Sequence, residues 1–171
     1  MSQYPTKQQI FDWLTHKHLE GKNGIIFDCA QFSSFDLIQD FIETYDHPFQ
    51  TPIIYYQAFP EESAIQFLNT LGAELISKLG ISESTQSTSL AEIVRRAELK
   101  TIIIDRCHLH PLDTLTNLLE VFASFQVSVI LVGAKSKIEV AQILKLEAVA
   151  DWDRLIIKPE CKQDKGLCRS C

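Results

Sequence analysis

The chain has 171 residues, of which 46% are hydrophobic and 22% are charged, and its formal net charge is −6. This length suits one α/β domain, and the charge excludes strong unaided binding to a nucleic-acid backbone, because that affinity comes mainly from Lys and Arg. No apolar run approaches the roughly 20 residues that span a bilayer, and no basic-then-apolar signal opens the chain, so we expect a cytoplasmic protein.

Short apolar runs rich in β-branched residues alternate with amphipathic segments. The apolar runs predict strands at residues 24–30, 51–59, 101–105, 127–133 and 154–159. The amphipathic segments predict helices at residues 6–21, 32–45, 60–80, 90–99, 111–125 and 136–152. Strands that are apolar throughout and separated by helices indicate a parallel sheet covered on both faces, so the predicted class is doubly wound α/β.

Polar residues and Pro mark several expected helix starts. Ser33 or Ser34 is expected to cap the second helix, and Pro60, followed by two Glu residues, is expected to open the third. The stretch "GISESTQSTS" is polar and lacks periodicity, so it predicts a flexible loop, after which Thr88 or Ser89 caps the next helix.

The tail differs in composition from the rest of the chain. We expect residues 1–159 to form one domain and residues 160–171 to be a flexible Cys-containing extension. Cys161, Cys168 and Cys171 follow the spacing C-x6-C-x2-C, in which the last pair is as close as in a zinc knuckle. Because no fourth ligand is evident, a disordered tail is the favoured interpretation and a zinc site is the alternative.

The ends of the strands are the first places to look for a ligand site. In doubly wound sheets ligands bind beyond the carboxyl ends of the strands, which directs attention to Asp28, Asp105 and the residues after Gly133. The stretch "TIIIDRCHLH" is a buried strand that delivers Asp105 to the sheet edge, where a carboxylate can hold magnesium. The next residue is Arg106, where a nucleotide-hydrolysing enzyme would have an acid.

Three stretches together resemble a known family: "IFDWL", "TPIIYYQ" and "TIIIDRCHLHPLDTLTNLLEVFASFQVSVILVGAKSKIEVAQIL". In order and spacing they are similar to the AAA+ ATPases of transposition, of the TniB and TnsC type, over most of residues 8–157. The resemblance implies a three-layer P-loop NTPase fold, with a five-stranded sheet in the order 2-3-4-1-5.

The phosphate-binding loop of that family has the pattern G-x-x-x-x-G-K-[ST], in which backbone N–H groups, a Lys and a hydroxyl hold the phosphates and magnesium. Here the corresponding stretch is "DCAQFSSF", from Asp28 to Phe35, which contains neither Gly nor Lys. Phe35 takes the place of the magnesium-binding hydroxyl. Ser33 and Ser34 are what remains of a phosphate loop in this degenerate motif.

The second motif of that family, the acidic motif at the end of the strand at residues 101–105, also lacks a group that hydrolysis needs. By resemblance, Asp105 is the residual magnesium-site acid, while Arg106 replaces the acid that would polarise the attacking water, and a guanidinium cannot act as a base. Ala134 or Lys135 occupies the polar sensor position, and only Arg154 lies near the place of the family's arginine. The sequence therefore predicts a catalytically inactive P-loop-like fold.

Other polar groups have two interpretations each. His108 and His110 could bind a metal together with Asp105 and Cys107, but a polar loop at a strand end is favoured, because spacing alone is weak evidence for a site. Asp28 with Cys29 could suggest a nucleophile, but no His base lies near them in sequence, so a structural role is favoured.

The basic residues Arg95, Arg96 and Lys100 could contact phosphates in an oligomer, although a solvated helix face is the favoured interpretation.

Two functions remain open. The leading hypothesis is a non-catalytic adaptor or regulator that associates with a related ATPase, or with a transposition or other nucleoprotein complex, and contacts nucleic acid only weakly or indirectly. We expect it to need no cofactor. The alternative is an AAA+ nucleotide-binding ATPase with a non-standard phosphate loop, in which Asp105 keeps a magnesium–ATP complex.

Overall fold

The computed structural model describes residues 5–28, 33–45, 53–79, 89–133 and 142–157. One sheet contains five strands: β1 (Gly24–Asp28), β2 (Ile53–Gln57), β3 (Thr101–Asp105), β4 (Ser128–Gly133) and β5 (Asp153–Ile157). Their order is β2-β3-β4-β1-β5, and all neighbouring pairs are parallel. Both the doubly wound α/β class and the strand order implied by the resemblance are confirmed.

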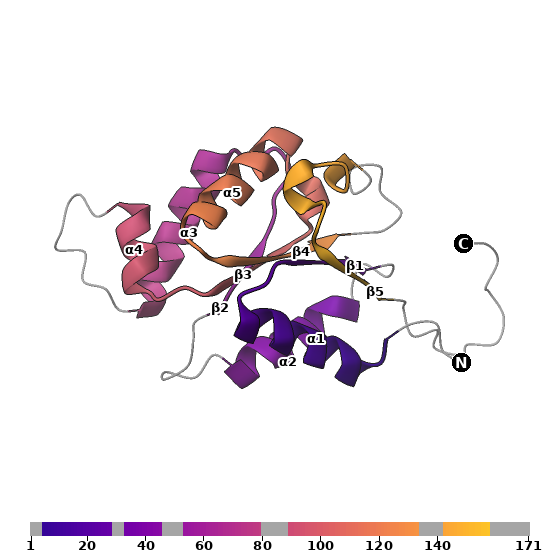
Figure 1. Ribbon diagram of the computed structural model, residues 1–171. Helices are drawn as coiled ribbons and strands as arrows, with labels where there is room; N and C mark the ends of the chain where they lie inside the picture. The colour runs from indigo at the N-terminus through magenta and orange to yellow at the C-terminus, as the bar shows by residue number, and fades with distance from the viewer. Residues whose placement is uncertain (1–4, 29–32, 46–52, 80–88, 134–141, 158–171) are drawn as a thin grey trace.

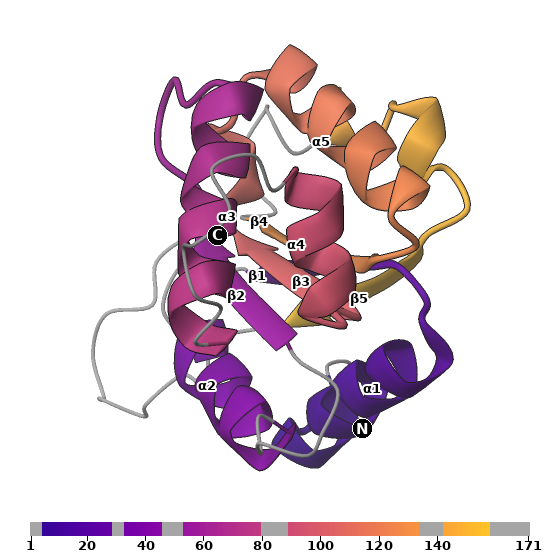
Figure 2. The ribbon, with the colours of Figure 1, turned by 90° about the vertical axis from the view of Figure 1, so that its left-hand side faces the viewer.

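Helices cover both faces of the sheet (Figures 1 and 2). One layer consists of α1 (Lys7–Glu20) and α2 (Ser33–Tyr45). The opposite layer consists of α3 (Ala64–Leu79), α4 (Leu90–Arg96) and α5 (Leu112–Ser124). Among the helices in the described ranges, none has both the length and the hydrophobicity to cross a bilayer.

The apolar strands supply two separate cores. Side chains of successive strand residues point to opposite faces, so Ile102 and Ile104 enter the larger core under α3, α4 and α5, while Ile103 enters the smaller core over α1 and α2. All three are fully buried. A strand whose side chains pack in both cores must be apolar at every position. For this reason these strands show no alternation of apolar and polar residues in the sequence.

The start of α3 differs from the prediction. Pro60 does not open the helix, because Glu61 has a left-handed backbone with φ of 60°, which a helix cannot contain. The helix begins at Ala64 instead. Reciprocal hydrogen bonds between Ser63 and Gln66, at 2.9 and 3.2 Å, satisfy backbone N–H groups at this end.

The last predicted helix, residues 136–152, ends earlier than expected. Residues 134–141 lie outside the described part of the chain, and residues 142–143 are helical. Leu146 is extended, with φ −65° and ψ 130°, and a 3-10 helix, η2 (Glu147–Val149), follows. This change of direction buries Val149 completely and brings Trp152 against the larger core, so packing overrides the helical periodicity.

The predicted first helix is confirmed as α1, and both of its ends are capped. Thr6 and Gln9 form a reciprocal capping box, and Gly21 ends the helix with a left-handed φ of 63°. Ile10 and Leu14 are buried as their spacing predicts. Leu19, which departs from that spacing, is 69% exposed.

Candidate functional site

The carboxyl ends of the strands bring the two acids predicted from the sequence, Asp28 and Asp105, to one edge of the sheet. Asp105 ends β3, next to Gln57 at the end of β2. Asp28 ends β1, and β4 separates β1 from β3. The topology therefore places the two predicted acids as expected, although the side chain of Asp28 lies outside what the structure describes.

The Asp105 carboxylate accepts hydrogen bonds through both of its oxygens. The Tyr55 hydroxyl donates to Oδ2 at 2.5 Å, and the Arg106 backbone N–H donates to Oδ1 at 2.7 Å. Burial, and then the hydrogen bond to Asp105, raise the pKa of Tyr55, so the phenol remains a donor at every physiological pH. Each oxygen of the carboxylate thus accepts one hydrogen bond from within the protein.

Arg106 takes an unusual conformation directly after β3. Its backbone is left-handed, with φ of 53° and ψ of 36°, and Arg106 as a whole is exposed. When the Gln57 side-chain amide is oriented with its oxygen toward Arg106, that oxygen accepts hydrogen bonds from Nε and Nη2 of the guanidinium at 2.8 and 3.0 Å. The guanidinium is therefore held at the end of β2, against the Gln57 side chain.

A buried cluster that sequence patterns did not indicate links the loops after β2 and β3. Glu62 accepts a short hydrogen bond from the Tyr56 hydroxyl, and its Oε2 lies 3.1 Å from His110 Nε2. The Thr114 hydroxyl donates to the Glu62 carbonyl at 3.1 Å. Because Glu62 and His110 are 48 positions apart, no local pattern could have paired them.

His110 lies in an apolar setting on its other side. Its side chain is fully buried, and its ring meets the Phe67 ring edge to face with the centroids 5.6 Å apart. Nδ1 has no hydrogen-bond partner among the described residues. Burial lowers the pKa of His110, although the hydrogen bond to Glu62 acts in the opposite direction.

These contacts concern the metal site that the sequence offered as an alternative, with His108, His110, Asp105 and Cys107 as its ligands. His110 pairs with Glu62 and Asp105 with Tyr55, so the residues named for that site have different partners. Cys107 is buried, and desolvation raises the pKa of its thiol to about 12, which keeps it protonated. The part of the chain that the structure describes has no group of three or more His, Cys, Asp or Glu suited to a metal. The favoured loop is in fact a 3-10 helix, η1 (Cys107–Leu109), followed by the buried His110.

The basic residues of α4 form ion pairs on the surface, as the favoured interpretation expected. Ser89 caps this helix by accepting from the Glu92 N–H at 3.3 Å. Arg95 and Arg96 both bond the Glu92 carboxylate, at 2.7 and 2.9 Å. These two hydrogen bonds lower the pKa of Glu92 to about 2.

Several predicted residues cannot be placed. Cys29 and the whole tail, with Cys161, Cys168 and Cys171, lie outside the described residues. The same holds for Ala134 and Lys135.

The backbone of Ser33 and Ser34, the two residues predicted for a degenerate phosphate loop, is described by the structure. α2 begins at Ser33, but the side chains of Ser33 and Ser34 are not described, so their roles in capping or phosphate binding stay predictions.

Comparison with known proteins identifies the fold. The sequence matches no protein-family model and no curated protein. The structure of Drosophila ORC bound to AT-rich DNA and Cdc6 is similar with a TM-score of 0.62 at 7% identity, over 89% of this chain and 28% of that one. The Pif1 helicase from Candida albicans is similar with a TM-score of 0.53 at 13% identity, over 93% of this chain and 40% of that one. The fold is the three-layer α/β fold of P-loop NTPases, and this chain spans less than half of either protein.

Proposed function

We propose that this chain is a non-catalytic AAA+-like module that acts through its surfaces in the cytoplasm, as an adaptor or regulator of an ATPase or a nucleoprotein complex related to DNA transposition. The observation that carries the proposal is the environment of Asp105. Both carboxylate oxygens accept hydrogen bonds from the chain itself, and the next residue is Arg106. These contacts support the proposal that Asp105 has a structural role here in place of holding magnesium.

The residues present do not fit a magnesium–nucleotide complex. The Tyr55 hydroxyl and the Arg106 N–H each use one acceptor site of the Asp105 carboxylate. The Arg106 guanidinium bonds Gln57, the register neighbour of Asp105, and its positive charge opposes a cation there. The stretch from Asp28 to Phe35 supplies neither the Gly residues nor the Lys of a phosphate loop. Phosphoryl transfer depends on positioning and charge stabilisation by these groups, so their replacement supports a scaffold role.

The choice of partner rests on two kinds of similarity. The resemblance of "TIIIDRCHLH" and the following segments to TniB and TnsC points to transposition, and one structurally similar assembly is bound to AT-rich DNA. The net charge of −6 opposes direct binding to phosphates. We therefore propose that the chain contacts nucleic acid only indirectly, through a protein partner. That partner would be a related ATPase with which the chain forms an oligomer.

A nucleotide-binding ATPase with a non-standard loop is the second candidate. The retained P-loop NTPase topology favours it, because Asp28 and Asp105 still lie at the carboxyl edge on either side of β4. In that case Ser33, Ser34 and Asp105 would contact the nucleotide.

Hydrolysis assays separate the two candidates. With radiolabelled ATP and magnesium, the native chain and its Arg106→Glu variant should both give no turnover above buffer, because a restored acid has no positioned phosphate to act upon. Turnover by the native chain, abolished by Asp105→Ala, would establish the second candidate instead.

A further inference from the structure

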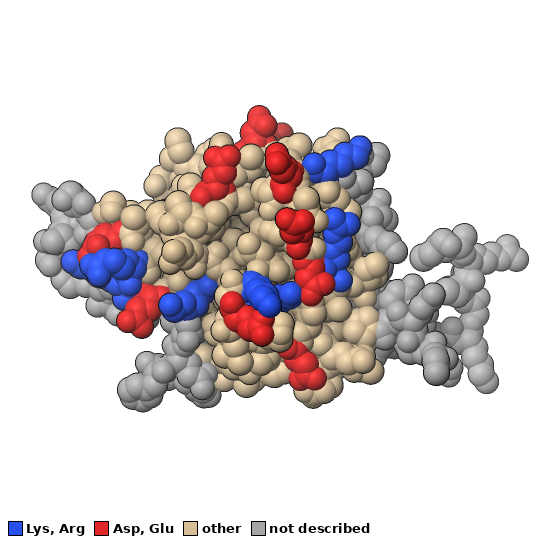
Figure 3. Space-filling model, viewed as in Figure 1, with Lys and Arg blue, Asp and Glu red and all other residues tan. Residues whose placement is uncertain are grey.

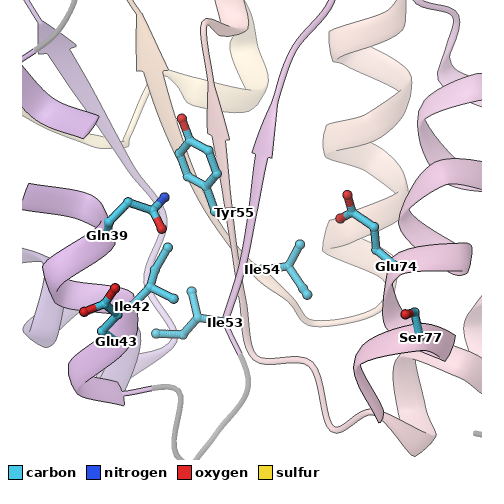
Figure 4. Close-up of a pocket in the computed structure, with 8 residues that line it drawn as sticks. All are labelled: Gln39, Ile42, Glu43, Ile53, Ile54, Tyr55, Glu74 and Ser77. Carbon is cyan, nitrogen blue, oxygen red and sulfur yellow. The ribbon is translucent and has the colours of Figure 1, made fainter. Parts of the chain in front are cut away.

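A hollow of about 530 Å³ lies beside β2, between α2 and α3 (Figure 4). Two of the residues that line it, Ile53 and Ile54, are 0% and 4% exposed and pack in the two cores on opposite faces of the sheet. Buried side chains offer no apolar surface to a ligand, so this hollow is not a binding site. The other end of β2 differs, because the segment that follows it is anchored through a single residue.

Residues 59–62, which we call the strap, connect the end of β2 to the start of α3. The strap has no regular secondary structure, and Glu61 turns it with a left-handed φ of 60°, a strained conformation for a residue other than Gly. Phe59 is 60% exposed, and Pro60 and Glu61 are exposed as well. A segment with so little burial can open at a small cost in free energy.

Glu62 anchors the strap. Among the described residues it makes every hydrogen bond between the strap and the elements beside it. Its carboxylate accepts from the Tyr56 hydroxyl on β2, and Oε2 lies 3.1 Å from Nε2 of His110. Its carbonyl accepts from the Thr114 hydroxyl on α5 at 3.1 Å. Release of this one residue therefore detaches the strap from β2 and α5 together.

His110 has no contact with solvent while the strap is closed. Its side chain is 0% exposed, and its ring meets the Phe67 ring of α3 edge to face with the centroids 5.6 Å apart. With Nε2–H donating to Glu62, Nδ1 carries no proton and has no partner among the described residues. A second proton would place an N–H at Nδ1 in an apolar setting, where the donor stays unsatisfied.

The charges around His110 favour its protonation once water reaches the ring. Glu62 faces it from the strap, and α3 meets it with the uncharged Phe67. Glu61 and Asp113, both exposed, add negative charge on the strap and in the first turn of α5. Figure 3 shows acidic side chains without basic ones over α5. Such surroundings stabilise a hydrated imidazolium.

We propose that the strap is an acid-operated device, in which protonation of His110 releases residues 59–62 while the sheet stays folded. Burial lowers the pKa of His110 in the closed form, whereas the open form takes up a proton near the ordinary value of 6.5. The strap therefore stays closed above pH 6.5, and opening becomes more favourable as the pH falls from there toward the closed-form pKa. This inference is independent of the proposed function.

Native-state proteolysis of the full chain, with a protease that cleaves after Glu, measures the opening. Cleavage after Glu61 requires an open strap, so its rate follows the open population when closing is fast. Relative to a free peptide with the sequence of residues 56–66, this rate should rise severalfold from pH 7.0 to 5.5. One proton taken up at a pKa of 6.5 sets a limit of about eightfold. Cleavage after Glu120, within α5, requires unfolding of the core and should be at least about tenfold slower at both pH values.

Variants assign the acid response to its source. His110→Gln keeps a donor for Glu62 and cannot gain a charge, so the acceleration in acid should disappear. His16→Gln is the matched control, because the His16 side chain is 56% exposed on α1, and it should keep the full acceleration. Glu62→Gln removes the charged acceptor but retains Glu61 as the cleavage site, and it should raise the rate at pH 7.0 by about threefold or more.

Four results would overturn the inference: equal rates after Glu61 and Glu120, no acceleration in acid, acceleration that persists in His110→Gln, or the native rate at pH 7.0 in Glu62→Gln. Circular dichroism verifies that each variant is folded. If His110→Gln is not, the native pH dependence and Glu62→Gln decide. ATP turnover by the native chain would refute the proposed function without changing these rates, so the two failures are distinguishable.

Discussion

Tyr55 and Asp105 lie on neighbouring strands, two register positions apart, and the Tyr55 hydroxyl reaches along the sheet to donate to the Asp105 carboxylate at 2.5 Å. Both side chains are partly buried. The acid at the end of β3 therefore accepts a hydrogen bond from the neighbouring strand. Asp105, for which the family resemblance predicts a magnesium-site role, thus has a structural partner in this chain.

Removing this hydrogen bond should destabilise the protein measurably. Tyr55→Phe should lower the free energy of unfolding by about 1–2 kcal/mol, because a bond to a charged acceptor is lost and the carboxylate stays partly buried. In an Asp105→Ala background the same substitution should cost less than about 0.5 kcal/mol. Urea denaturation of the four proteins gives this comparison, and equal costs in both backgrounds would show that the bond contributes no stability.

Stability should fall with acidification because of two buried His residues. Burial lowers the pKa of His110 and of His18 below the ordinary value of 6.5. Below that value the unfolded chain takes up protons that the folded chain does not, so stability is complete above pH 6.5 and is lost as the pH falls toward the folded-state pKa.

The variant His110→Gln tests this dependence while keeping a donor for Glu62. Between pH 7 and 5 its unfolding free energy should fall less steeply than that of the native protein. The remaining slope should decrease further in His18→Gln/His110→Gln, because His18, bonded to Thr101 at 2.8 Å, titrates in the same direction. An unchanged slope in the double variant would contradict this account.

Two Gly residues should respond in opposite ways to a methyl group. A Cβ on Gly24 would lie 2.7 Å from Cζ2 of the Trp13 ring, and a packed indole cannot yield cheaply, so Gly24→Ala should cost at least about 2 kcal/mol. Gly72 lies within α3, where the nearest atom would be 3.6 Å away.

Gly72→Ala is thus the matched control, and it should be neutral or stabilising by up to about 1 kcal/mol, since Ala is the better helix former. Thermal unfolding of the two variants decides between these expectations. Equal effects of the two substitutions would mean that Trp13 does not pack on β1 as described.

The strands were predictable because their physical cause is local. Ile102, Ile103 and Ile104 pack in two cores, and burial on both faces of the sheet requires an apolar residue at every position of the strand. The position of Asp105 followed from the same strand. The order of the strands required the family resemblance, since apolar runs alone do not specify their neighbours.

The side-chain partners were not predictable, because they join distant positions. Tyr55 meets Asp105 across 50 positions, and Glu62 meets His110 across 48. Sequence periodicity placed Glu62 at a helix start, whereas the left-handed Glu61 moves that start to Ala64. The first contact joins two neighbouring strands and the second joins the segments that follow them, and no local spacing encodes either.

The most direct test of the central claim is isothermal titration of the full chain with ATP and magnesium. A phosphate loop contributes several charge-assisted contacts of roughly 1.5–3 kcal/mol each, and losing three or more removes most of the roughly 8 kcal/mol that a micromolar ligand requires. We predict no binding stronger than about 1 mM. A dissociation constant in the low micromolar range, lost in Asp105→Ala, would contradict the account and show that this edge of the sheet is a nucleotide site.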